Sequence, residues 1–223
     1  MNQKFVRKVL FLARYYEAFG ILWFLWDTPV VYPLKIFVGL LHESSHGIAA
    51  LATGGSIERI VLNAQEGGAC YCPGGNQFIT LSAGYLGSLL WGGLMFSLAR
   101  AKQINTGWIN SLIGMTVIAL SLLYIRSDFG LLFGILFGIT LFFIAQKGAP
   151  AVNRATLLML GLTSVLYAIL DIKSDILDRP NTLSDARMLA DLTGVPTIVW
   201  GLVWISIAII FSFRLFQRAY KEA

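Results

Sequence analysis

Apolar residues form long runs along most of this chain, and short polar segments separate them. A helix needs roughly 20 such residues to cross about 30 Å of hydrocarbon, and several runs reach or approach that length. An earlier and weaker run, Val9–Trp26, is interrupted by Arg14 and Glu17 but lacks a clear signal-peptide cleavage site, so we expect it to be retained. The stronger candidates are Leu34–Thr53, Phe78–Leu98, Gly107–Ile125, Phe129–Ala145, Ala155–Leu170 and Pro196–Leu215. This pattern predicts an all-α polytopic membrane protein with six or seven transmembrane helices.

The composition agrees with a membrane protein. Hydrophobic residues make up 57% of the chain and charged residues 13%, with a mean hydropathy of +0.71. A soluble domain carries about 25% charged residues. The net charge of +5 is spread over loops and chain ends, so it suits membrane topology and gives no reason to expect nucleic-acid binding. Without linkers or repeats, residues 1–223 are predicted to form a single integral-membrane domain.

The polar segment Gly54–Gln77 follows the second apolar run. Its two leading glycines are placed to end a helix. Ser56–Asn63 and Ala69–Cys72 flank a Gly-Gly pair and are predicted to form a short β-hairpin-like insertion. Further along, the small residues between 83 and 93 predict a helix that packs closely against a neighbour.

The chain has only two histidines, and both belong to the sequence His42-Glu43-Ser44-Ser45-His46. Residues four apart share one face of a helix, so this H-E-x-x-H motif lets both imidazoles bind one metal ion while Glu43 lies beside them. Zinc peptidases use this arrangement to activate a water molecule. Ionisable groups within an apolar run are costly in a bilayer, which favours a functional role over a structural one.

A catalytic zinc takes three protein ligands, and the chain has no third histidine. The segment Asp171–Val195 holds five of the twelve acidic residues. Asp171 is the favoured third ligand because it ends an apolar helix, which can carry it to the depth of the motif. Asp175 is the second choice, as a ligand or as a group that orients one, and Asp185 is a distant third, because Ser184-Asp185 also predicts a helix N-terminus. The Cys70-Tyr71-Cys72 sequence is a weaker alternative, since a tight C-x-C is more often a thiol pair.

The run LLHESSHGIAALATGG, a short glycine-bearing segment and then SAGYLGSLLWGG resemble the site-2 protease family of intramembrane zinc metallopeptidases, in its small bacterial-type B-like branch. The resemblance is specific over Leu40–Gly93 and looser over Leu170–Trp204. It implies that His42 and His46 are zinc ligands, that Glu43 is the general base, and that a distant aspartate completes the site. The family's usual Asn-Pro and Leu-Asp-Gly signature for that aspartate is absent.

The sequence supports two opposite orientations of the protein in the membrane. With six full spans, the distribution of basic residues favours placing Gly54–Gln77 outside the cytoplasm. The resemblance implies that this segment is cytoplasmic, with Val9–Trp26 as a seventh span. We favour the second topology because active-site geometry constrains a fold more tightly than a modest charge bias.

The sequence therefore predicts a zinc-dependent intramembrane or juxtamembrane endopeptidase in the bacterial cytoplasmic membrane. Its expected partners are the lipid bilayer and a membrane-embedded or membrane-adjacent protein substrate. The alternatives are a non-proteolytic pseudoprotease or scaffold, and a metal-handling transporter. The intact motif argues against the first alternative. A transporter would usually carry polar sites along a path through several helices, which argues against the second.

Overall fold

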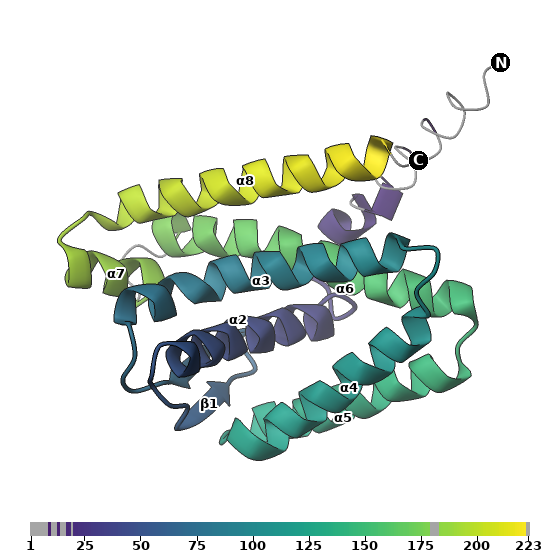
Figure 1. Cartoon of the computed structure of the whole chain (residues 1–223), viewed down its shortest axis with the longest axis horizontal. Coiled ribbons are helices and arrows are strands. Elements are labelled where there is room, and N and C mark those ends of the chain that lie inside the picture. Colours follow the sequence, from purple (N-terminus) through teal and green to yellow (C-terminus); the bar gives the residue numbers. More distant parts are fainter. Residues whose placement is uncertain (1–8, 10–12, 14–16, 19, 179–182, 222–223) are drawn as a thin grey trace.

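The computed structural model describes residues 9, 13, 17–18, 20–178 and 183–221. Over these residues the protein is a bundle of helices with one small β-hairpin (Figure 1). The elements are α2 (Tyr32–Ala52), β1 (Arg59–Leu62), β2 (Gly68–Tyr71), α3 (Gln77–Arg100), α4 (Thr106–Tyr124), α5 (Asp128–Lys147), α6 (Pro150–Lys173), the π-helical turn η1 (Ser174–Asp178), α7 (Asp185–Thr193) and α8 (Thr197–Lys221). The predicted all-α fold with a short hairpin after the motif helix is confirmed.

Five helices in the described part of the chain are long and apolar enough to cross a membrane, and they identify an integral membrane protein. They are α3, α4, α5, α8 and the helix that contains α6. The motif helix α2 has 21 residues, which corresponds to about 31 Å at a rise of 1.5 Å per residue. It is not among the five, and it contains Lys35 in addition to the polar residues of the motif. The predicted span Val9–Trp26 lies partly outside the described residues, so the total of six or seven spans stays a prediction.

Helices α3 and α6 form the centre of the bundle. Helix α8 runs along one side of them, and the α4–α5 pair covers the other (Figure 1). Glycines permit the close approach of α3 and α6: a Cβ at Gly92 would lie 2.9 Å from the carbonyl oxygen of Gly161, and one at Gly161 would lie 2.7 Å from the amide nitrogen of Phe96. The small residues of α3 therefore act in helix packing, as predicted.

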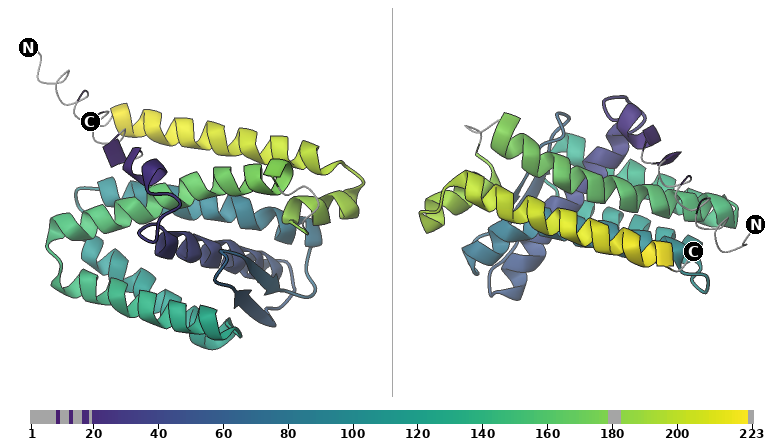
Figure 2. Two further views of the ribbon diagram at one scale, coloured as in Figure 1. Left: turned by 180° about the vertical axis from the view of Figure 1, so that it is seen from behind. Right: turned by 90° about the horizontal axis from the view of Figure 1, so that it is seen from above.

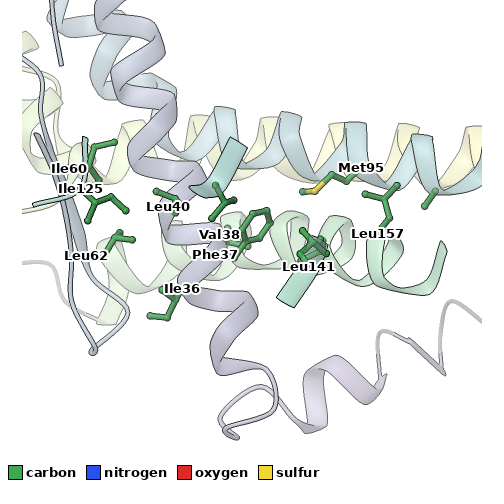
Figure 3. Packing of buried hydrophobic residues seen from close by; sticks show 13 residues of the cluster. Ile36, Phe37, Val38, Leu40, Ile60, Leu62, Met95, Ile125, Leu141 and Leu157 are labelled. Carbon is green, nitrogen blue, oxygen red and sulfur yellow. The ribbon is translucent and has the colours of Figure 1, made fainter. Parts of the chain in front are cut away.

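One face of α2 is fixed by the largest hydrophobic cluster among the described residues. Phe37 is fully buried and stacks on Phe137 of α5, with ring centroids 5.0 Å apart. Ile60 of β1 and Ile125, just after α4, extend the same cluster under the hairpin (Figure 3). This packing holds α2 and the hairpin in one position relative to α4 and α5.

The hairpin begins where α2 ends. Gly54 adopts a left-handed conformation with φ of 90°. The amide of Gly54 bonds to the carbonyl of Leu51, and the amide of Gly55 bonds to that of Ala50, which together close the helix with a Schellman motif. Strands β1 and β2 then pair antiparallel, with Arg59 opposite Tyr71, and lie beside α2 (Figure 2). Both the predicted helix end and the predicted hairpin are confirmed.

Candidate metal centre

Helix α2 presents the three functional residues of the motif to the interior of the protein. Glu43 and His46 are buried, and the side chain of His42 is 12% exposed. Because His42 and His46 are four residues apart, their rings lie one turn from each other, with centroids separated by 4.8 Å. The sequence motif therefore becomes a pair of imidazoles inside the bundle.

Asp185 reaches these imidazoles from a distant part of the chain. Its Oδ2 atom lies 2.9 Å from Nε2 of His42 and 3.1 Å from Nε2 of His46. Two ring nitrogens and one carboxylate oxygen thus converge within the part of the chain that the structure describes. This is a histidine–histidine–carboxylate set, which is one of the combinations that hold catalytic zinc.

The position of Asp185 follows from helix α7. The hydroxyl of Ser184 caps this helix by accepting a hydrogen bond from the amide of Arg187. Ala186 and Leu189 are fully buried and pack in a cluster with Trp204 of α8. The short helix therefore satisfies its own backbone while it packs against α3 and α8, and its first residue is carried to the histidines. The predicted helix start at Ser184-Asp185 is confirmed.

The other nitrogen of each histidine has a partner of its own. Nδ1 of His46 lies 2.7 Å from the backbone carbonyl oxygen of Thr80, to which it can donate a hydrogen bond. Nδ1 of His42 faces Oδ2 of Asp171 at 3.7 Å. In metal sites such partners fix the tautomer, leaving the opposite nitrogen free to coordinate. Both Nε2 atoms are therefore oriented as ligands, so these residues fit a zinc ion.

The surroundings of Asp185 favour its charged form, which is the form that binds a metal. Burial disfavours its charged form, but the positive charge of His46 and hydrogen bonds from His42 and His46 outweigh that effect. Together they hold the pKa of Asp185 well below its usual range.

The two aspartates that the sequence favoured lie near the histidines but not at the point where the three ligand atoms converge. Asp171 faces the Nδ1 side of His42, as described above. Asp175, in the turn η1, accepts a hydrogen bond from the hydroxyl of Tyr85. The ring of Tyr85 is edge-on to His42, with centroids 5.1 Å apart. The geometry favours Asp185 as the third ligand and gives Asp171 and Asp175 positions around His42.

Gly84 in α3 provides the space that the histidines occupy. A Cβ at this position would lie 2.6 Å from both Cε1 and Nε2 of His46, and it would also clash with Nε2 of His42. The sequence pattern indicated helix packing for this glycine. The structure adds direct contact with both candidate ligands, which periodicity alone does not reveal.

Strand β2 lies against the third residue of the motif. The backbone amide of Cys70 donates a hydrogen bond to the carboxylate of Glu43, and a Cβ at Gly68 would lie 2.7 Å from Oε1 of the same carboxylate. Cys70 and Cys72 form a disulfide, so neither thiol is a metal ligand in this structure. The hairpin therefore supports Glu43 through its backbone.

The two edges of the hairpin differ. On the outer edge of β1, the carbonyl of Ile60 accepts from the amide of Arg126, and Leu62 bonds through both its amide and its carbonyl to Ser127. On β2, the register turns Gly68 and Cys70 away from β1. Their outward carbonyls have no hydrogen-bond partner among the described residues. One edge is closed, and the other is open beside Glu43.

A cavity of about 860 Å³ joins these features. The motif residues, Asp171 and Asp185 line one part of it, and strand β2 forms a wall. Lys35 and Glu66 line it further from the histidines. The cavity therefore connects the histidines, Glu43 and the open edge of β2.

A family model described as Peptidase M50B-like matches residues 15–214. The match covers most of the chain and includes the motif, the hairpin and Asp185. Comparison with curated proteins gives no significant match, and comparison with solved structures gives none either.

Proposed function

Because the chain belongs to the Peptidase M50B-like family, we propose that it is a zinc-dependent endopeptidase that cleaves peptide bonds within or beside the bilayer. The observation that carries the proposal is the convergence of His42, His46 and Asp185, whose facing atoms lie 2.9 and 3.1 Å apart in a helical membrane protein. Burying three ionisable groups, fully or in part, in a membrane protein costs free energy, so their presence together favours a functional site.

The proposed metal ligands are Nε2 of His42, Nε2 of His46 and a carboxylate oxygen of Asp185. A zinc ion held there would supply a Lewis acid able to polarise a water molecule and the peptide carbonyl. Asp171 orients the ring of His42 from its Nδ1 side, and the carbonyl of Thr80 does the same for His46. These partners keep both rings in the geometry that coordination needs.

Glu43 is the proposed general base. Its carboxylate is held by the amide of Cys70 on one side and is next to the histidines on α2. From that position it takes a proton from the attacking water and returns it to the leaving amine. Glu43 is not needed to hold the metal, so its role is separable from that of the histidines.

The substrate is proposed to bind as an extended strand along the open edge of β2. Helical peptide bonds are internally hydrogen-bonded and shielded, so a transmembrane segment must unwind before it is cut. The outward carbonyls of Gly68 and Cys70 offer main-chain acceptors for such a strand, as in other complexes that add a strand to a sheet. The hydrogen bond from Cys70 to Glu43 keeps that edge next to the general base.

The cellular setting is also a proposal. We place the protein in the bacterial cytoplasmic membrane, with the hairpin towards the cytoplasm and a membrane-embedded or membrane-adjacent protein as substrate. Cysteine labelling at position 65, in a variant without Cys70 and Cys72, tests the orientation. Labelling by a reagent confined to the outside would reverse it.

The direct test combines metal analysis with cleavage. The purified protein in detergent is expected to hold one zinc ion per chain and to cut a transmembrane peptide, and removal of zinc by a chelator is expected to stop cleavage. A zinc-bearing protein without hydrolysis of any such peptide would favour the scaffold or transporter. A protein without zinc would contradict the proposed centre.

A further inference from the structure

A second charged pair lies in the cavity, away from the catalytic cluster. Lys35 of α2 is only 5% exposed, and its Nζ atom is 2.8 Å from Oε1 of Glu66 at the tip of the hairpin. Nζ also lies over the ring of Trp26, 5.3 Å from its centroid. A buried ammonium in a membrane protein is costly without such partners. Lys35 is seven residues before His42, so two helical turns place both on the same face of α2.

Glu66 has an unusual backbone. Its φ is 67°, and it is the one non-glycine residue with positive φ among those described. Glycine adopts this conformation without steric cost, whereas glutamate does not. Glycines follow directly at positions 67 and 68, and a glycine at position 66 as well would form this turn without backbone strain. The glutamate side chain at this position therefore points to a specific use.

The hairpin tip is tied to two helices. The hydroxyl of Tyr32 donates to the carbonyl of Ala64 at 2.8 Å, in addition to the Lys35–Glu66 ion pair on the same helix. From α6, the hydroxyl of Tyr167 donates to the carbonyl of Glu66 at 3.4 Å. These contacts fix how far the hairpin extends along α2.

The same contacts determine what faces the general base. Along one face of α2, Lys35, Gly39 and Glu43 meet the hairpin at intervals of four residues. Lys35 binds Glu66, the Cβ of a residue at position 39 would lie 4.0 Å from the carbonyl oxygen of Glu66, and Glu43 meets Gly68 and Cys70. If the residues at the tip changed the pairing of β2 with β1 by one position, the backbone groups of β2 that now face outwards would turn towards β1.

We propose that Lys35 and Glu66 are a positioning pair that sets the register of β2 against Glu43, and with it the register of a substrate strand. This proposal rests on the proposed peptidase function. The pair acts through the hairpin, so neither residue needs to touch the scissile bond. Stability alone does not explain a buried ion pair at this position, because apolar side chains of similar volume stabilise a protein equally well.

The test compares Glu66→Gln with Glu58→Gln. Glu58 is a control at the start of the same hairpin: its side chain is 58% exposed and pairs with the neighbouring Arg59. Kinetics are measured on a long peptide that can pair with β2 and on a short peptide that cannot. Glu66→Gln is expected to keep zinc and to raise KM for the long peptide about tenfold or more, with little change for the short one. Glu58→Gln is expected to match the wild type on both.

Two further variants keep the proposal open to contradiction. Glu66→Gly relieves the backbone at φ of 67° while it removes the carboxylate, so its turn still forms, and it is expected to behave as Glu66→Gln does. The exchange Lys35→Glu with Glu66→Lys restores the pair and is expected to recover most of the lost KM. Wild-type KM for Glu66→Gly, an equal loss on both peptides, or no recovery on exchange would overturn the positioning role.

A readout without catalysis separates this proposal from the proposed function. Hydrogen exchange of residues 58–72 in the substrate-free protein is expected to be faster in Glu66→Gln than in wild type, and unchanged in Glu58→Gln. If the wild type neither binds zinc nor cleaves, the peptidase proposal fails. Unchanged exchange in Glu66→Gln overturns the positioning pair whether or not the enzyme is active.

Discussion

The α4–α5 pair and the region of α2, the hairpin and α7 show two ways of building within a membrane. Between Thr106 and Tyr124, helix α4 has no ionisable residue that carries a full charge at neutral pH, and α5 has charges only at its ends. The two helices touch through Gly114 and Gly138. By contrast, α2 buries Lys35, His42, Glu43 and His46 or holds them largely inside.

The difference lies in what compensates for desolvation. In α4 and α5, close packing of small residues and hydrogen bonds between uncharged polar groups, such as that from Gln146 to Ser111, suffice because no charged side chain is buried between the two helices. In α2, each charged group has a partner from another element: Glu66 for Lys35, Asp185 for the histidines, and an amide of β2 for Glu43. The α4–α5 pair therefore supports the fold, whereas the region of α2, the hairpin and α7 holds the candidate metal site. The same kind of substitution should therefore have different consequences in each.

The largest effect is expected at Glu43. Glu43→Gln keeps the size of the side chain and removes its basicity, so cleavage is expected to fall by about 10²–10⁴-fold or more while zinc content stays at the wild-type level. Zinc analysis and peptide hydrolysis on one preparation measure both. Wild-type turnover in this variant would remove Glu43 from the mechanism.

Next in size is the contrast between the aspartates. Asp185→Ala is expected to lose zinc and activity, as are His42→Ala and His46→Ala. Asp171→Ala is expected to retain binding with an affinity weakened by about 10–100-fold, since a partner of a ligand typically has that effect. Titration with a competing chelator measures the affinities. Full zinc binding by Asp185→Ala together with loss in Asp171→Ala would make Asp171 the ligand.

A matched pair of glycine substitutions compares the two regions directly. Gly84→Ala places a methyl group 2.6 Å from Nε2 of His46, and Gly114→Ala places one 2.8 Å from the carbonyl oxygen of Gly138. Overpacking of this kind costs about 1–3 kcal/mol. Gly84→Ala is expected to lose zinc affinity, whereas Gly114→Ala is expected to lower the Tm and keep its zinc affinity. Equal zinc affinities in the two variants would contradict a special role for Gly84.

The smallest effect is expected at Tyr85. Tyr85→Phe keeps the ring beside His42 and removes the hydroxyl that donates to Asp175, a change of about 1 kcal/mol for a typical hydrogen bond. Zinc affinity is expected to weaken a few-fold. Tyr124→Phe in α4, which does not line the cavity, serves as the control and is expected to leave zinc affinity unchanged.

Local rules predicted much of this molecule. The spacing of His42 and His46 placed both on one face of a helix, and the glycines at 54 and 67–68 marked the helix end and the hairpin turn. The apolar runs gave the ends of the long helices to within six residues. Each of these features depends on residues close together in the chain, where periodicity and backbone conformation decide the outcome.

The proposed third ligand could not be identified in this way, because it depends on a contact between distant parts of the chain, which local rules do not describe. From the sequence, Asp185 is the least favoured of the three aspartates because Ser184-Asp185 predicts a helix N-terminus, where a carboxylate can serve as a cap. The structure removes that objection, since the hydroxyl of Ser184 caps helix α7 and the carboxylate of Asp185 faces the histidines. The pairing of Lys35 with Glu66 was equally hidden, because it depends on how the hairpin lies along α2.

The separation of the ligands along the chain also bears on biosynthesis. His42 and Asp185 are 143 positions apart, so a ribosome finishes the motif helix long before it reaches the helix that completes the centre. Until α7 emerges and packs, the nascent protein has two histidines and a glutamate but no third ligand. If Asp185 is the third ligand, as proposed, the protein cannot cleave neighbouring membrane segments while its own synthesis is under way.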